Sequence, residues 1–231
     1  MSEPTRPCHR TVLRILDTLD AGFLERARCF FGGGTRIVLA LGEYRESADV
    51  DFLCANGEGY RMLRSTVGDA SLGRIAKPGL RLAREVIADR YGIRTVIETG
   101  GEKLKFEIIL EGRIGLSGGS VDGLPVPALD PRSCCAEKFL ANADRWNDES
   151  VLGRDAIDLA FMGARWGREP LRAGLEVATE AYGKVVARAA RRAATKLLEQ
   201  AAWRRRCIAA LSLTDTRTLL SGLRLLAAGR R

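Results

Sequence analysis

The chain has 231 residues, of which 46% are hydrophobic and 29% charged. This is the composition of an ordinary soluble protein that is long enough to bury a core. No apolar run approaches the roughly 20 residues of a membrane span, and no apolar segment follows the N-terminal charges, so neither a membrane protein nor a secretory signal is expected. The net charge of +8 is uneven, because the tail Lys184–Arg231 alone carries +10.

A basic tail of this kind is typical of a protein with a polyanionic partner, although a solvated helix surface would have the same composition. The six cysteines show no disulfide spacing and His9 is the only histidine. Reduced thiols and a cytoplasmic location are therefore expected, with no zinc site and no Ser–His or Cys–His nucleophile.

The first 67 residues predict helices and short strands in alternation around a glycine turn. The expected elements are a helix, a strand, the turn, a helix, a strand and a helix, over Thr11–Ala27, 28–31, Gly32–Gly34, Thr35–Gly42, Asp49–Ala55 and 58–67.

Two features of this stretch carry chemistry. Glycines before a helix allow a close approach to the helix N-terminus, where unpaired N–H groups and the helix dipole favour a phosphate. Asp49 and Asp51 project from one face of the predicted strand, while Val50 and Phe52 point into the core. Two adjacent carboxylates repel each other unless a cation lies between them, and their hard oxygens suit Mg²⁺. Either feature alone is most often structural, but their combination predicts a site.

A hairpin is expected next, from strands over Arg94–Glu98 and Lys103–Leu110 joined by a turn at Thr99–Glu102. Glu107 is a third carboxylate within an apolar strand. It is either part of the same site, or the polar face of this strand serves a cross-strand salt bridge between Lys105 and the neighbours of Glu107.

The residue pattern after Pro131 predicts helices throughout. Helices are expected over Ser133–Trp146, Val151–Trp166, Ala187–Ala202 and Thr216–Ala228. The Gly- and Pro-rich stretch Gly112–Asp130 before them is the best candidate for a boundary. The expected organisation is therefore a catalytic core over residues 1–128 and a helical domain over residues 129–231 that completes the active site and carries the basic tail.

Four sequence blocks resemble, in order, the motifs of the AbiEii/AbiGii toxin family, which are nucleotidyltransferases of the polymerase β superfamily. The blocks are GGGTxxxxL with RxSxDVDF, KFEI, AEKFLANADRW and GRDAIDLAFM. The resemblance implies an α+β fold, with a polymerase β-like mixed sheet, flanking helices and an α-helical C-terminal region. It also implies a toxin of a toxin–antitoxin system, hence an antitoxin partner.

The resemblance further implies a role for each matching residue. Asp49, Asp51 and Glu107 would bind Mg²⁺ or Mn²⁺, and the catalytic set would add Lys138 and Asp158, with Asp155 as an alternative to Asp158. The nucleotide-binding set is Gly33, Gly34, Thr35, Arg45, Ser47, Lys138 and Asp155.

The reaction expected is transfer of a nucleoside monophosphate from a nucleoside triphosphate to a hydroxyl acceptor, with release of pyrophosphate. An RNA or tRNA end is the acceptor that the basic tail favours. The alternatives are a hydroxyl of a protein or of an aminoglycoside, or a catalytically inactive module that binds RNA or another partner.

Overall fold

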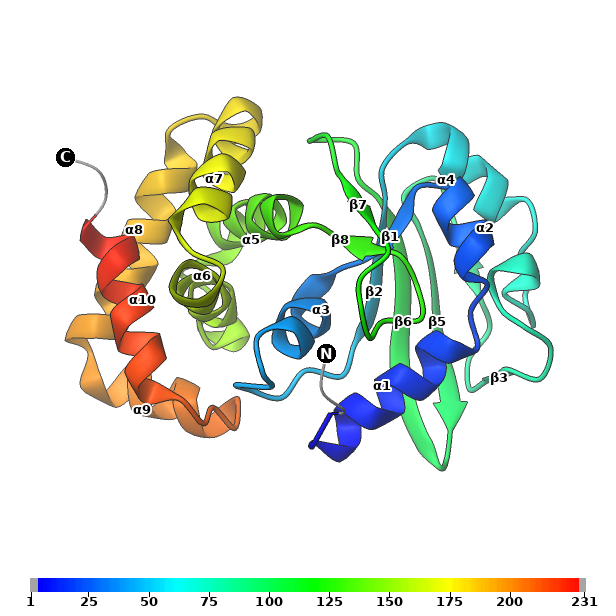
Figure 1. Cartoon of the computed structure of the whole chain (residues 1–231), viewed down its shortest axis with the longest axis horizontal. Coiled ribbons are helices and arrows are strands. Elements are labelled where there is room, and N and C mark those ends of the chain that lie inside the picture. The colour runs from blue at the N-terminus through cyan, green and yellow to red at the C-terminus, as the bar shows by residue number, and fades with distance from the viewer. Residues whose placement is uncertain (1–3, 229–231) are drawn as a thin grey trace. The chain divides into compact units, whose positions relative to one another are not determined.

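The computed structural model describes residues 4–228 (Figure 1), so Arg230 and Arg231 of the basic tail lie outside the described residues. The chain forms two compact units. One contains the residues up to Ala40 together with Ser47–Asp130, and the other contains Leu41–Glu46 together with the residues from Pro131 onward. The second junction lies two residues after the expected boundary, and the segment 41–46 was not expected to leave the first unit.

The first unit is built on a mixed sheet. Its described strands are β1 Cys29–Phe31, β2 Val50–Cys54, β3 Arg81–Leu82, β4 Ile87–Ala88, β5 Gly92–Thr99, β6 Glu102–Leu110, β7 Gly118–Gly119 and β8 Ala128–Leu129. The order is β3-β5-β6-β2-β1-β8-β7, with β4 on β5. The β2–β6 and β1–β8 pairs are parallel and the others antiparallel. The hairpin of β5 and β6 is confirmed, since Thr99 pairs with Glu102.

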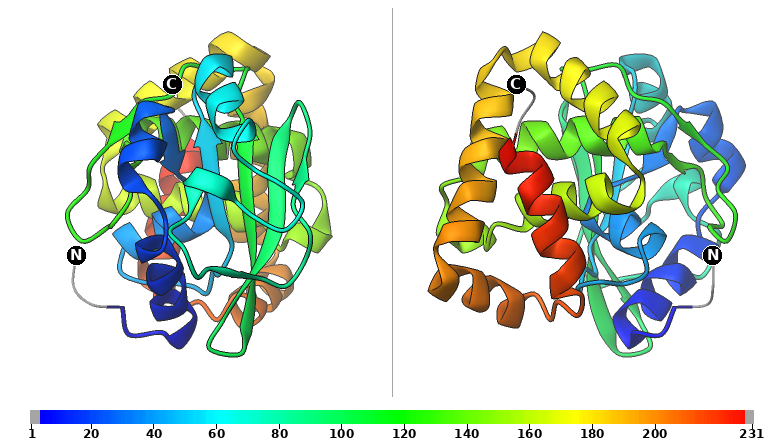
Figure 2. Two further views of the ribbon diagram at one scale, coloured as in Figure 1. Left: turned by 90° about the vertical axis from the view of Figure 1, so that its right-hand side faces the viewer. Right: turned by 60° about the vertical axis from the view of Figure 1, so that its left-hand side comes forward.

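The helices of this unit are α1 Pro7–Asp17, α2 Ala21–Arg26, α3 Gly33–Ala40 and α4 Gly57–Arg64, with a short 3-10 turn over Gly73–Ile75. Figures 1 and 2 show α1 and α2 on one face of the sheet and α3 on the other. Val12, Phe52 and Phe106 are buried together in the core on the α1 side. Because successive side chains of a strand point to opposite faces, Asp51 and Glu107 lie on the face of the sheet opposite this core.

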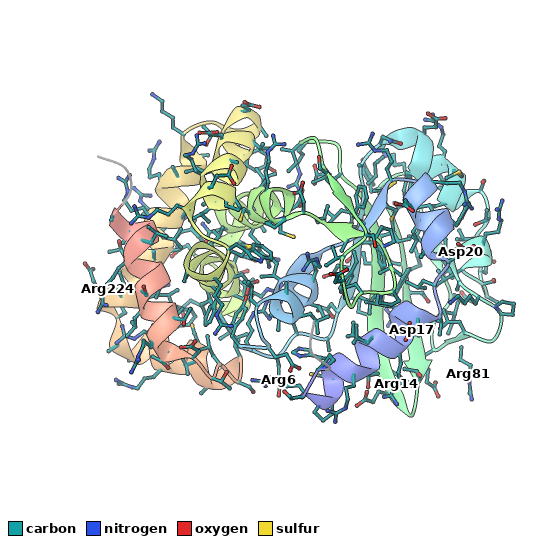
Figure 3. The ribbon with its side chains drawn as sticks, in the orientation of Figure 1. Arg6, Arg14, Asp17, Asp20, Arg81 and Arg224 are labelled. Carbon is teal, nitrogen blue, oxygen red and sulfur yellow. The ribbon has the colours of Figure 1, made fainter. Side chains whose placement is uncertain are left out.

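The expectation of one helix over Thr11–Ala27 was wrong. The Asp20 carboxylate accepts a hydrogen bond of 2.8 Å from the Phe23 N–H and caps α2, so that the apolar pattern is divided between two helices. Within α1 the amphipathic pattern holds. Arg14 and Asp17 are exposed, and Ile15 and Leu16 are buried (Figure 3).

The second unit is helical. Its helices are α5 Pro131–Arg145, α6 Arg154–Arg165, α7 Arg168–Tyr182, α8 Val185–Glu199, α9 Ala201–Ala210 and α10 Thr216–Ala228, with a 3-10 turn over Glu149–Val151. Helix α5 packs on α6, α7 and α8, and α10 packs on α6 and α8 (Figure 2). Gly222 makes the α10–α6 approach possible, since a Cβ there would overlap the Ala160 carbonyl.

Helix α10 begins and ends where it was expected, whereas the expected helix over Ala187–Ala202 is interrupted at Gln200. Across this break the Arg204 guanidinium donates hydrogen bonds to the carbonyls of Leu197 and Leu198, at 2.8 and 2.7 Å. Arg204 is therefore a cap for the end of α8. None of the helices described over residues 4–228 has the length and apolarity to cross a bilayer.

Candidate active site

The glycine turn leads directly into helix α3. Gly33 is the first residue of α3 and has a φ of +66°, and a Cβ at this position would overlap the Asp51 carboxylate. Only glycine accepts both the backbone conformation and this close approach. The turn therefore places the Asp51 carboxylate against the N-terminal end of α3, where the helix dipole favours an anion.

Thr35, in the first turn of α3, is hydrogen bonded to Ser47, in the loop that precedes β2. Thr35 is fully buried, and its hydroxyl shares a hydrogen bond of 3.0 Å with that of Ser47. The Gly32 N–H also donates to the Asp51 carbonyl at 2.8 Å. These contacts fix the start of α3 relative to the strand that carries Asp51.

The three carboxylates proposed as metal ligands lie on or beside two neighbouring parallel strands. Asp49 is exposed and directly precedes β2, and Asp51 lies on β2 in register with Glu107 of β6. Asp51 and Glu107 are both partly exposed. The pairing thus brings together residues that are more than 50 positions apart in the sequence.

Glu107 is engaged by two cations. Arg94 Nε donates to one of its oxygens at 2.7 Å, and Lys105 Nζ to the other at 2.5 Å. Burial raises the pKa of Glu107, but these two hydrogen bonds outweigh burial and the net pKa is lowered. The Lys105–Glu107 ion pair lies within β6, and the cross-strand ion pair of Glu107 is made by Arg94 of β5, a partner that was not expected.

Lys105 also lies in the field of the two aspartates. Its pKa is raised, first by the hydrogen bond to Glu107 against the lowering effect of burial, and further by the charges of Glu107, Asp51 and Asp49. Lys105 thus interacts favourably with all three carboxylates, and most strongly with Glu107.

A second polar cluster is buried in the helical unit. Asp158 on α6 is fully buried and accepts hydrogen bonds from Arg45 Nε and Nη2, both at 2.8 Å, and from the Tyr44 hydroxyl at 2.6 Å. Tyr44 also stacks on Phe161, with ring centroids 3.7 Å apart. These contacts explain why the segment 41–46 belongs to this unit.

Lys138 connects Asp158 to its neighbour on α6. Its ammonium group lies 2.9 Å from Asp158 Oδ2 and 3.0 Å from Asp155 Oδ1, and Arg145 pairs with Asp155 at 2.7 Å. Burial raises the pKa of Asp158, but the charges of Arg45 and Lys138 outweigh it and hold that pKa well below its ordinary value. The cluster is a buried ion network with nearly balanced charge.

The sequence matches the AbiEii nucleotidyltransferase toxin family of type IV toxin–antitoxin systems over residues 14–218. This match covers most of the chain. The protein belongs to the AbiEii family.

Two solved structures share the fold. A proposed nucleotidyltransferase from H. pylori is 15% identical, with a TM-score of 0.53, and the match covers 95% of this chain and 93% of that one. JHP933 from Helicobacter pylori is 13% identical with the same TM-score, over 95% and 90% of the two chains. No curated protein sequence matches this chain significantly. The nucleotidyltransferase fold, with a mixed sheet, flanking helices and a helical C-terminal region, is confirmed.

The residues of this AbiEii protein fit a divalent cation in their chemistry. Nucleotidyltransferases of the family generally use such an ion, and Asp49, Asp51 and Glu107 offer only the carboxylate oxygens that Mg²⁺ prefers. Within residues 4–228, however, no three His, Cys, Asp or Glu side chains are already close enough to hold a metal ion.

The AbiEii motif residues thus fall into two clusters, each within one unit. Glycines 33 and 34, Thr35, Ser47 and the three carboxylates belong to the first unit, and Arg45, Lys138, Asp155 and Asp158 to the second. No motif of the sequence includes Arg94 or Tyr44. Strand register could have indicated Arg94, which pairs with Glu107, but no local pattern indicates Tyr44.

Gly33→Ala is expected to lower nucleotide transfer at least about tenfold while most of the fold is retained. The added methyl group must displace the Asp51 carboxylate, and the left-handed backbone at this position costs on the order of 1 kcal/mol for a residue with a side chain. Transfer of a labelled nucleotide and thermal unfolding measure the two effects. Gly100→Ala is the matched control, because Gly100 has a φ of +58° but its nearest other atom is 3.9 Å away. Equal losses of activity in both variants would contradict the role of Gly33.

Proposed function

We propose that this AbiEii toxin transfers a nucleoside monophosphate from a nucleoside triphosphate to the hydroxyl of an RNA acceptor, namely a tRNA end, with Mg²⁺ as the metal and Mn²⁺ as a substitute. The observation that carries the proposal is the Asp51 carboxylate, held against the start of α3 by Gly33 and in register with Glu107. A phosphate-binding helix end and carboxylates for a cation are the two requirements of nucleotidyl transfer.

In this proposal the first turn of α3, with Gly33, Gly34 and Thr35, binds the triphosphate through backbone N–H groups. Ser47 holds that turn through its hydrogen bond to Thr35. A cation bound by Asp49, Asp51 and Glu107 would neutralise charge on the triphosphate and on the departing pyrophosphate. Catalysis then depends on positioning and charge stabilisation, so no covalent nucleophile is needed.

Lys138 keeps its proposed role as a triphosphate contact, with Asp155 and Asp158 as the residues that hold it. Its ammonium group pairs with both carboxylates. Arg45, which is buried and bound to Asp158 through two nitrogens, positions the network rather than balancing a phosphate charge.

The RNA acceptor is supported by the side chains of α8 and α9. Two cations lie near the Trp203 ring, with Lys196 Nζ 5.0 Å and the Arg206 guanidinium 5.5 Å from its centroid, and the Arg192 guanidinium lies 5.9 Å from the Trp146 ring. Cationic side chains beside aromatic rings suit single-stranded RNA, since phosphates pair with the former and bases stack on the latter. Arg224 of α10 adds a further exposed charge (Figure 3).

Arg205→Gln with Arg206→Gln is expected to weaken RNA association about three- to tenfold and to lower the slope of log affinity against log salt by up to about two. Both arginines are exposed, whereas Arg204 caps α8 and must be left in place. A salt titration of RNA binding measures the effect. Arg84→Gln with Arg90→Gln removes the same charge from the first unit as a control, and equal effects of the two pairs would contradict a specific RNA surface.

The function is tested by incubating the protein with each labelled nucleoside triphosphate and total RNA, then with protein extract, and then with an aminoglycoside. Label in RNA supports the proposal. Label found only in protein, or only in the aminoglycoside, would mean that the enzyme transfers nucleotides but that RNA is not the acceptor. No label with any acceptor, together with RNA binding, would indicate the inactive RNA-binding module.

The partner set of this proposal is a nucleoside triphosphate, an RNA acceptor and the cognate antitoxin that a type IV toxin–antitoxin system implies. We place the reaction in the cytoplasm, where these substrates are found. No disulfide bond joins the six cysteines, all of which lie within residues 4–228.

A further inference from the structure

The two cations on Glu107 differ in how firmly they are held. Arg94 donates to Glu107 and also lies 3.3 Å from Asp89, and its side chain is 34% exposed. Lys105 has Glu107 as its ion-pair partner at 2.5 Å, and its side chain is 53% exposed. Because an exposed lysine has a long flexible stem and is easily solvated, Lys105 is the partner that leaves readily.

The position of Lys105 also matters. It shares a face of β6 with Glu107, two residues away, and Glu107 is in register with Asp51 on the parallel neighbour β2. An ammonium group at this place lies among carboxylates that would otherwise repel each other. The Lys105 ammonium group reduces the repulsion between the carboxylates, as a bound cation would. It also occupies the Glu107 oxygen that such a cation would need.

We infer that Lys105 is a tethered counter-ion that competes with the divalent cation for Glu107, so that loading of the site breaks the Lys105–Glu107 ion pair. Arg94 keeps the other oxygen and holds the carboxylate in place during the exchange. The inference rests on the proposed function only in taking Asp49, Asp51 and Glu107 as the cation site.

One consequence is that the site binds the cation more weakly than three unpaired carboxylates would. A second is that the carboxylates stay compensated between turnovers, when product and metal have left. Lys105 is in this sense a positioning residue, because it acts on the site through Glu107.

The test is Mn²⁺ binding to the full chain, measured by the loss of the free-ion paramagnetic resonance signal, without nucleotide. Lys105→Gln should bind Mn²⁺ about two- to fivefold more tightly than the wild type, a range that corresponds to the worth of an exposed ion pair. Lys105→Arg, which keeps the charge, should remain near the wild-type affinity. Lys103→Gln, which removes the same charge from the same exposed face of β6, should change affinity much less.

The Glu107→Gln background makes the test specific. Adding Lys105→Gln there should give a much smaller gain, because the exchanged carboxylate is already absent and only the weaker interaction of Lys105 with the two aspartates remains. An equal gain in both backgrounds, or an equal gain from Lys103→Gln, would overturn the inference in favour of a general charge effect. Absence of saturable Mn²⁺ binding by both the wild type and Lys105→Gln would also overturn the inference. Nucleotide transfer measured in parallel tests the proposed function separately, because transfer without such binding would contradict the inference alone.

Discussion

Asp51→Asn is expected to reduce nucleotide transfer by at least about 10²- to 10³-fold, the loss typical when a preorganised charge is removed from a transition state. The substitution is isosteric, so the amide still fits beside Gly33 at the start of α3. It nevertheless removes the anionic oxygen that would bind the cation. The loss should therefore appear in the rate of label incorporation, with the fold retained.

The control for this prediction is Asp69→Asn, which removes an exposed carboxylate from the same unit. Circular dichroism and thermal unfolding of both variants establish that the fold is intact. Asp51→Asn with more than about a third of wild-type activity would refute the carboxylate mechanism. Asp49→Asn should behave like Asp51→Asn, because the proposed cation needs both side chains.

Asp158→Asn is expected to destabilise the helical unit by about 3–5 kcal/mol, the usual cost of breaking a buried ion pair by removing one partner. The change leaves Arg45 and Lys138 with less compensating charge in a site where Asp158 is fully buried. Denaturant unfolding followed by tryptophan fluorescence measures it, since all three tryptophans lie in this unit. Glu180→Gln on α7 is an exposed control.

The pH dependence of this effect has a definite sign. Because the pKa of Asp158 is held low in the folded protein, its contribution is fully present above the unfolded carboxyl value of about 3.9. It is lost as the pH falls through the folded-state value. The difference in unfolding free energy between wild type and Asp158→Asn should therefore narrow below about pH 4. A difference that is constant from pH 7 to pH 3 would contradict the ionic origin of the effect.

Two further variants separate the roles within this network. Tyr44→Phe removes one hydrogen bond to Asp158 and should cost about 1 kcal/mol. Lys138→Met tests the proposed phosphate contact: a raised KM for the triphosphate beyond any loss of stability supports it. An unchanged KM in a folded Lys138→Met variant would leave Lys138 with a structural role.

Local sequence patterns determined the chemistry-bearing elements of the first unit. The alternation in KLKFEIIL predicted β6 and its hairpin, because successive side chains of a strand point to opposite faces. The same alternation separated Asp51 from Phe52, and the glycines marked the start of α3. The four motif blocks were sufficient for the family, which the match over residues 14–218 confirms.

Tertiary structure decided the contacts that depend on distant partners. The break at Asp20 came from a capping hydrogen bond that an apolar pattern does not record. Arg94 became the ion-pair partner of Glu107 because the register of β5 and β6 places the two residues opposite each other. Arg45 and Tyr44 donate hydrogen bonds to Asp158, which is 113 and 114 residues away in the sequence. These contacts make the segment 41–46 part of the helical unit. Periodicity indicates which side chains are buried, whereas the partner of a buried charge is chosen by the whole fold, because it must offset the cost of removing that charge from water.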